Sequence, residues 1–158
     1  MLARMIALLV LVPTAMSAQA GPRYINPPTL VKPNGYTHVV VAPDGRTAYV
    51  AGQVAYDSTG QLVGGNDFKA QAERVFQNLR RALASVGGSL DDVVKTTTFV
   101  TDEKHLAALR EIRLKYLDPT HPPANTLVVV SSLARPTLLI EIEAVAVLRN
   151  VVRQTDAH

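Results

Sequence analysis

Apolar residues recur at the spacing of one face of an α-helix between Asp67 and Val86. The charged residues of this segment fall off that stripe, which is typical of a helix packed on a core. Asn66 or Asp67 can cap its start, and Gly87-Gly88 can end it through a left-handed backbone position. We expect core packing, and no cofactor role, from the stripe: Phe68, Ala72, Val75, Phe76, Leu79, Leu83 and Val86.

Runs rich in β-branched residues predict strands on both sides of this helix. Two runs, 38–42 and 47–51, are joined through Pro43-Asp44-Gly45 and should pair as an antiparallel hairpin. A short strand can follow over 61–63. Beyond the helix the pattern predicts a strand, a second helix and two more strands: 93–101, 103–117 with Asp102 as its cap, 126–133 and 138–149.

The order of these elements, β-β-(β)-α-β-α-β-β, predicts one α+β domain in which two helices cover one face of a sheet. The other face has no third helix to cover it, although apolar residues such as Val128 and Val145 belong to it. Self-association is an economical way to bury such a face. The sequence therefore favours an oligomer.

The last predicted strand carries two carboxylates on one face. Side chains alternate along a strand, so Glu141 and Glu143 share a side with Val145, while Ile140 and Ile142 lie on the other. An unpaired buried charge is costly, so these glutamates either line a covered cleft or partner interface, or they touch solvent on a half-exposed strand. The pattern alone leaves both interpretations open.

The first twenty residues have the pattern of a cleaved signal peptide. A positive residue precedes an apolar run, and a small-x-small cleavage site follows: Arg4, 5–12 and Ala18-Gln19-Ala20. The alternative is a membrane anchor, but the uncharged stretch 5–18 spans 14 residues, whereas crossing the hydrocarbon core takes roughly 20. We therefore expect cleavage after Ala20, no stable membrane insertion, and a periplasmic or secreted protein.

The rest of the chain divides into three parts by composition. Residues 21–35 include four prolines and should form an irregular N-terminal arm. The folded domain is expected over 36–149, and 150–158 is a polar tail. At 158 residues, with 47% hydrophobic and 18% charged residues, the chain suits one globular domain.

Composition argues against several classes of function. Aromatic residues make up 5% of the chain, Trp is absent, and the net charge of +3 is spread out, so we expect no nucleic-acid partner. No cysteine is present, and the four histidines show no ligand spacing, so no metal site is expected. Nucleotide-binding glycine motifs and a G-x-S-x-G elbow are also missing from the sequence.

Four segments occur in the order and at spacings similar to those of the reactive intermediate deaminase (Rid, or YjgF-like) family: VAGQV at 50–54, VVKTTTFVTD at 93–102, PPAN at 122–125 and IEIEAVAV at 140–147. The resemblance covers about 36–148. It implies a Rid/chorismate-mutase-like fold and a homotrimer whose sheets form a central barrel, with small-molecule clefts between subunits.

Rid proteins that act as deaminases hydrolyse enamines and imines derived from amino acids, so the resemblance implies a similar reaction here. In such proteins an arginine binds the substrate carboxylate and a glutamate positions the attacking water, without a cofactor. Three positions fit this pattern. Glu141 matches the water-positioning acid, Tyr36 the tyrosine at the cleft, and Gly52 the glycine whose backbone approaches the ligand.

Three other positions depart from the family pattern. Asn125 stands where the arginine is expected, Ala51 replaces a serine, and Lys104 replaces a cleft asparagine. A neutral amide lacks the bidentate, charge-assisted grip of a guanidinium on a carboxylate. Lys104 can restore a cation from another direction, although a solvated lysine is the ordinary expectation at the start of a helix.

Three hypotheses for function follow. The first is a cofactor-free enamine/imine deaminase-like hydrolase with an altered, less anionic substrate. The alternative is a non-catalytic trimer that binds a small metabolite in the same intersubunit cleft. The third is a purely structural or chaperone-like oligomer. Glu141 distinguishes them, because only the enzyme requires its carboxylate.

Overall fold

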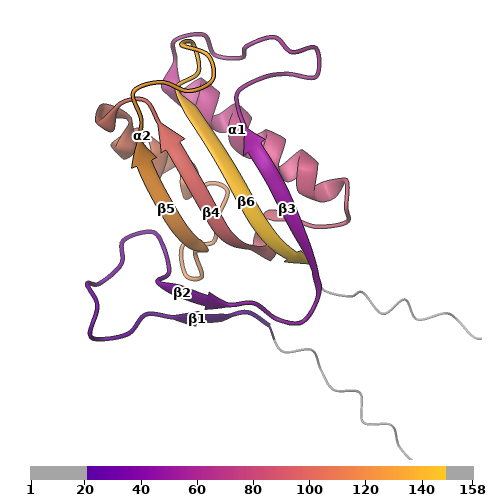
Figure 1. Ribbon diagram of the computed structural model, residues 1–158, viewed down its shortest axis with the longest axis vertical. Helices are drawn as coiled ribbons and strands as arrows, with labels where there is room; N and C mark the ends of the chain where they lie inside the picture. Colours follow the sequence, from indigo (N-terminus) through magenta and orange to yellow (C-terminus); the bar gives the residue numbers. More distant parts are fainter. Residues whose placement is uncertain (1–20, 149–158) are drawn as a thin grey trace, which may run out of the picture.

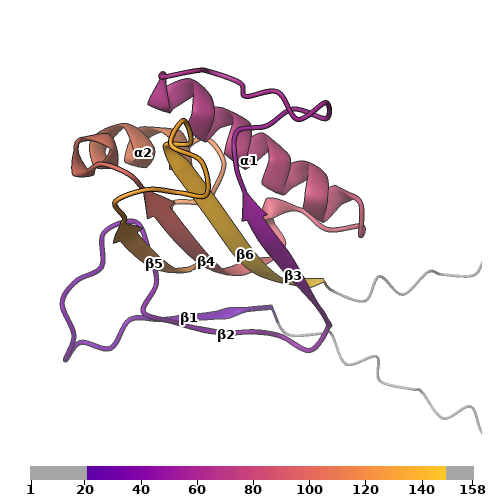
Figure 2. The same ribbon diagram turned by 45° about the horizontal axis from the view of Figure 1, so that its top comes forward.

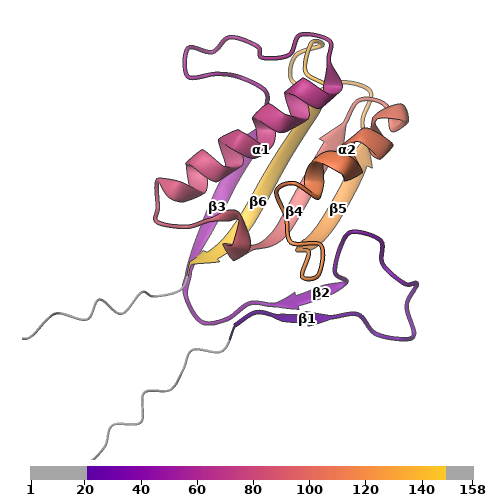
Figure 3. The same cartoon turned by 180° about the vertical axis from the view of Figure 1, so that it is seen from behind.

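The computed structural model describes residues 21–148, in which a four-stranded sheet carries two helices on one face (Figures 1 and 3). Its strands are β3 (Arg46–Gln53), β4 (Val93–Val100), β5 (Ala124–Val129) and β6 (Ile140–Leu148), in the spatial order β3-β6-β4-β5. β6 is antiparallel to both neighbours, and β5 is parallel to β4. The predicted α+β architecture is confirmed.

The long helix α1 (Phe68–Ala84) follows the predicted apolar stripe. Asp67 caps it by accepting hydrogen bonds from the amides of Lys69 and Ala70. Gly87 has a φ of 78°, and the next amide, that of Gly88, donates to the carbonyl of Leu83 at 2.9 Å. This backbone closure is the one that glycine at the end of a helix favours. The stripe from Phe68 to Leu83 packs on the helix side of β3 and β6 to form the core. The prediction for Val86 is wrong, because the helix ends at Ala84 and Val86 is 44% exposed.

The second helix is shorter than the pattern predicts. Asp102 caps a 3₁₀ turn, η2 (Glu103–His105), and α2 covers only Leu106–Arg113. The backbone continues as turns, in which the amide of Leu117 still donates to the carbonyl of Arg113 at 2.9 Å. Pro119 has no amide hydrogen to extend this series. Another 3₁₀ turn, η1 (Leu90–Asp92), precedes β4.

The predicted hairpin of 38–42 with 47–51 is wrong. β2 (Val39–Val41) pairs instead with β1 (Arg23–Ile25), which lies in the arm expected to be irregular. The prolines of the arm flank β1 rather than interrupt it, so its amides remain available. At Gly45 the chain passes closely over the end of β6, where a Cβ would lie 2.5 Å from the carbonyl oxygen of Leu148. β3 therefore pairs with β6, and the β1–β2 ribbon lies at the end of the sheet where β3 begins (Figure 2).

Other predicted strands also differ from the structure, and β6 begins at Ile140 instead of residue 138. The segment 61–63 forms only an isolated bridge between Tyr56 and Leu62. β5 starts two residues earlier than expected and ends at Val129 instead of residue 133. It begins early because Lys95 of β4 already pairs with Ala124. The bridge between Thr37 and Ala124 also ties the start of β5 to the segment before β2.

A buried glutamine joins α1 to the beginning of β6. Gln71 is 0% exposed, and its Nε2 donates to the carbonyls of Gly65 at 2.6 Å and Thr137 at 2.8 Å. Its Oε1 accepts from the amide of Leu139 at 2.9 Å. The side chain thus satisfies three backbone groups, and two of them immediately precede the strand that carries Glu141.

Replacing Gln71 with leucine is expected to destabilise the fold strongly. The change keeps the volume but leaves three backbone groups without their partner, and each such group costs about 1–3 kcal/mol. We expect the free energy of unfolding to fall by about 3 kcal/mol or more, measured by urea denaturation. Gln61→Leu, at an exposed loop position, is the control and should change it by less than about 0.5 kcal/mol. An unchanged stability of Gln71→Leu would contradict this account.

Among residues 21–148, no helix is both long and apolar enough to cross a membrane. The predicted signal peptide and the polar tail lie outside the described residues.

Candidate active site

The two glutamates of β6 lie on the face of the sheet away from the helices. Ile140 and Ile142 are buried on the helix side, while Glu141 is half-buried and Glu143 exposed. We call this helix-free side of the sheet the open face. The two carboxylates therefore differ: Glu143 faces solvent in the single chain, and Glu141 lies against a neighbouring strand.

Glu141 lies directly over the backbone of Gly52. Gly52 lies in the irregular part of the β3–β6 ladder, between Val50 and Gln53. A Cβ on Gly52 would lie 2.8 Å from Cδ and 3.0 Å from Cγ of Glu141, and closer still to Oε1. Since Gly52 has no positive φ, close approach rather than backbone conformation requires glycine here. The structure thus brings together two of the predicted site residues.

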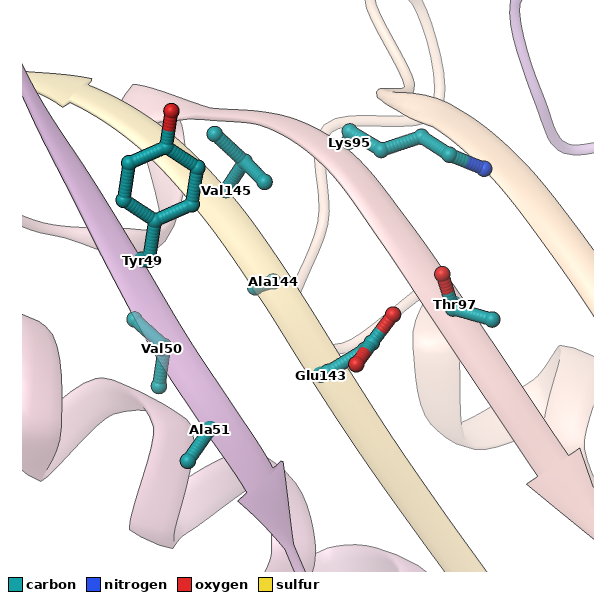
Figure 4. A pocket seen from close by; sticks show the side chains of 8 residues that line it. All are labelled: Tyr49, Val50, Ala51, Lys95, Thr97, Glu143, Ala144 and Val145. Carbon is teal, nitrogen blue, oxygen red and sulfur yellow. The ribbon is translucent and has the colours of Figure 1, made fainter.

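The open face beside this pair holds a shallow depression of about 350 Å³ (Figure 4). Tyr49, Lys95, Thr97 and Glu143 line it from three adjacent strands, and the Lys95 side chain extends away from the other three. Lys95 donates from Nζ to Oγ1 of Thr126 on β5 at 2.5 Å. Burial lowers the pKa of Lys95, and the nearby Glu143 carboxylate partly opposes that effect. This face is more polar than the apolar pattern of β6 suggests.

Asn125 is placed on the opposite side of the sheet. It pairs with Thr96 in the parallel β4–β5 ladder, and both Thr96 and Thr98 are buried on the helix side. Oδ1 of Asn125 accepts hydrogen bonds from the hydroxyls of Thr96 at 2.8 Å and Thr98 at 3.3 Å. In the single chain, the side chain at the position where the resemblance implies an arginine is therefore held by β4.

Tyr36 lies close to the same end of β5. The next residue, Thr37, bridges to Ala124, and its amide donates to the carbonyl of Pro123 at 3.2 Å. The Tyr36 ring is half-buried and meets the ring of His38 edge-on, with centroids 5.2 Å apart. Tyr36 and Asn125 therefore form a second group of predicted site residues, beside the edge strand.

Of the remaining two predicted positions, Lys104 contacts neither group, whereas Ala51 adjoins Gly52 and lines the depression. Lys104 forms an ion pair with Asp102 at 2.6 Å, and its side chain is 71% exposed. This is the solvated arrangement expected for a lysine at the start of a helix. Ala51 is exposed beside Gly52, and its carbonyl accepts a hydrogen bond from Nε2 of Gln53 at 3.0 Å.

A single chain does not assemble all the predicted residues. Glu141 pairs with Phe99, and Phe99 with Val128, which is three residues beyond Asn125 on β5. The two groups are therefore separated by two strand spacings across the sheet, roughly 10 Å, and by three residues along the strands, also roughly 10 Å. The Glu141 and Asn125 side chains also lie on opposite faces. Within one chain, the two groups therefore do not form a common cleft.

Sequence reasoning missed the residues that support these groups. Gln71 interrupts the apolar stripe of α1 at an inward-facing position, between Phe68 and Val75, and this polar interruption was the available signal. A polar residue at such a position must find buried partners. Thr96 and Thr98 gave no comparable signal, because threonine is common in strands.

Comparison with known proteins identifies the family. The family model described as "Endoribonuclease L-PSP" matches residues 29–148. The crystal structure of the Rid-family protein YyfB from Yersinia pestis is 40% identical, with a TM-score of 0.74, over 82% of this chain and all of that one. The chain belongs to the Rid family.

Two other members of the Rid family agree with this assignment. A RutC family protein from Pyrococcus horikoshii is 38% identical over 117 residues, which cover 73% of this chain and 89% of the relative. The RidA structure from an Antarctic Psychrobacter is 38% identical with a TM-score of 0.61, over 66% of this chain and 83% of that one. The resemblance inferred from the four sequence segments is therefore confirmed at the level of the family and fold.

Proposed function

We propose that this Rid-family chain is a cofactor-free hydrolase of the enamine/imine deaminase type that releases ammonia from a small imine. The observation that supports it is the Glu141 carboxylate, held half-buried against the backbone of Gly52. A carboxylate in that position can accept a proton from water while the strand backbone limits the approach of the substrate. Fold alone would not support this choice, because one fold serves many functions.

The proposed reaction needs only water and a proton shuttle. Glu141 accepts a proton from a water whose oxygen bonds to the electrophilic imine carbon, and the C=N π pair passes to nitrogen. The carbinolamine collapses when the nitrogen, protonated through Glu141, leaves as ammonia and the hydroxyl loses its proton. The balance is one imine and one water giving one carbonyl compound and one ammonia. The iminium carbon is already electrophilic, so no cofactor is required.

We propose that the functional unit is a homotrimer with the cleft between subunits. The separation of the two groups supports it: Glu141 and Gly52 of one copy would face Tyr36 of the next. The open face also carries exposed apolar side chains, including Tyr49 at 83% and Val128 at 37%. Association would remove these side chains from water.

We propose that the substrate is less anionic than a free 2-imino acid. Asn125 offers a neutral amide whose oxygen is engaged by two hydroxyls, and Lys104 is paired with Asp102. Neither supplies the planar cation that grips a carboxylate at two points. An imine that carries an amide or ester in place of the carboxylate fits these groups better.

The test combines oligomeric state with turnover. Light scattering of the full chain should give three times the monomer mass. Ammonia release from freshly generated imines should exceed the spontaneous rate, and should be faster for the amide of 2-iminobutanoate than for the free acid. Saturable binding of these compounds without turnover would support the metabolite-binding alternative and overturn the hydrolase. Cleavage of RNA that depends on Glu141 would overturn it as well.

Asn125→Arg is expected to shift the preference towards the free imino acid. Hydrogen bonds to charged groups contribute about 1.5–3 kcal/mol, so kcat/KM for 2-iminobutanoate should rise about tenfold. The gain is limited because the substitution removes the Asn125 oxygen, which accepts hydrogen bonds from the Thr96 and Thr98 hydroxyls in the wild type. Asn125→Gln keeps a neutral amide and is the matched control. An equal rise in both variants would show that charge is not the cause.

We propose a periplasmic or secreted location, reached through cleavage of residues 1–20. The mature protein should begin at Gly21, since Ala18-Gln19-Ala20 forms the small-x-small site. The intact mass of the protein from its native host measures this directly. A chain that retains Met1 in the membrane fraction would support an anchor instead.

A further inference from the structure

A second pocket lies between the end of α2 and the segment before β2, on the helix side of the molecule. Figures 1 and 3 show this segment beside the connection from α2 to β5. The pocket has a volume of about 300 Å³, and Arg110 and Arg113 line it together with Asn34 and Gly35. It contains none of the residues proposed for the imine site.

The two guanidiniums of this pocket have no carboxylate partner among residues 21–148. Arg113 donates from Nη2 to the carbonyl of Gly35, which leaves most of its donors unused. Burial and the neighbouring Arg110 both lower the pKa of Arg113, but an arginine stays charged in proteins. Like charges three residues apart on a helix are unfavourable unless an anion lies between them.

The acidic residues Glu111 of α2 and Glu73 of α1 already have partners. Glu111 pairs with Lys69 at 2.8 Å, and Glu73 with Lys115 at 2.5 Å. Asp118 also lines the pocket, but its oxygens accept from Thr120 and contact His121, and these contacts lower its pKa to about 2. The pocket therefore holds two cations against one engaged carboxylate.

The other walls of the pocket are apolar. Leu114, Leu117, Pro119 and Pro122 line it, and Leu114 is 63% exposed although it is a large hydrophobic residue. A guanidinium pair next to an aliphatic wall fits a small ligand that has a carboxylate at one end and a short hydrocarbon group at the other. We propose that this pocket binds a short-chain aliphatic carboxylate.

The test uses isobutyrate as the probe. Its binding to the full chain is measured by NMR titration, from the arginine Nε–H signals and the Leu114 amide signal. Saturable shifts should appear at these groups, and the matched neutral isobutyramide should bind at least tenfold more weakly. Arg110→Gln and Arg113→Gln should each weaken isobutyrate binding at least tenfold. The Arg110 side chain makes no hydrogen bond or ion pair with residues 21–148, and only its backbone carbonyl accepts one, from the amide of Leu114 at 3.3 Å. The Arg110→Gln variant therefore tests the charge without disturbing the fold.

Two controls make the result specific. Arg80→Gln, at an exposed position on α1, should leave binding unchanged. Glu141→Gln should also leave it unchanged, because this site does not rest on the proposed hydrolase function. Equal binding of isobutyramide, unchanged affinity in Arg110→Gln, or the absence of saturable shifts would overturn the proposal. Inorganic phosphate binding as tightly as isobutyrate would overturn the assignment to an aliphatic carboxylate.

Discussion

Replacing Glu141 with glutamine is expected to reduce imine hydrolysis at least about 100-fold, because general acid–base groups contribute about 10² to 10⁴ in rate. Glutamine keeps the size and hydrogen-bonding oxygen of the side chain but accepts no proton at neutral pH. The close contact with Gly52 is therefore preserved, and the oligomer should stay folded. The measurement is kcat for ammonia release, corrected for spontaneous hydrolysis.

Glu143→Gln is the matched control for this variant. Glu143 lies two residues further along the same strand, on the same open face, but it is exposed, and the three atoms nearest to a Cβ on Gly52 all belong to Glu141. It should retain a rate within about twofold of the wild type. A similar loss in both variants would indicate a general effect of charge on this face. An unchanged rate in Glu141→Gln would exclude the hydrolase mechanism and favour the binding protein.

Gly52→Ala is expected to lower kcat about 100-fold, since a displacement of about 1 Å in a catalytic group can cost that much. The added methyl would occupy the space of the Glu141 carboxylate, whose Cδ would lie only 2.8 Å away. The group that must move is the end of a flexible side chain, so the fold should survive while the carboxylate is displaced. Thermal denaturation and kinetics of the same sample measure the two effects.

The steric explanation also predicts how Gly52→Ala combines with Glu141→Gln. If Gly52→Ala acts only by displacing Glu141, then combining it with Glu141→Gln should cost little more than Glu141→Gln alone. Gly21→Ala is the matched control, because a methyl there meets nothing within 4 Å. Fully additive losses would show that Gly52 acts independently, through its own backbone contact with the substrate.

The local sequence pattern was sufficient to predict a helix or strand, and its buried face, where apolar residues repeat along one face of that element. The α1 stripe from Phe68 to Leu83, its Asp67 cap and the alternation of Ile140 and Ile142 with Glu141 were all predicted and are confirmed. In each case the signal lies within a few neighbouring residues, because helix and strand periodicity decides which side chains face the core. The four sequence segments likewise identified the family, which the comparisons confirm.

Pairing between distant segments was not accessible in this way. The turn signal at Pro43-Asp44-Gly45 favoured a local hairpin, but β6 provides a longer ladder for β3. The residues around this turn do not indicate which pairing is more stable, because β6, the partner of β3, lies about a hundred residues away in the sequence. For the same reason, the contact between Gly52 and Glu141 could be expected only from family resemblance.

The sequence by itself determined the fold class, the helix faces and the residue types available for chemistry. Only the tertiary structure decided which of those residues meet. It placed Glu141 against Gly52, turned Asn125 towards Thr96 and Thr98 on the other face, and brought Arg113 to Gly35. Periodicity depends on neighbours along the chain, whereas a site depends on strand register and on the face to which each side chain points.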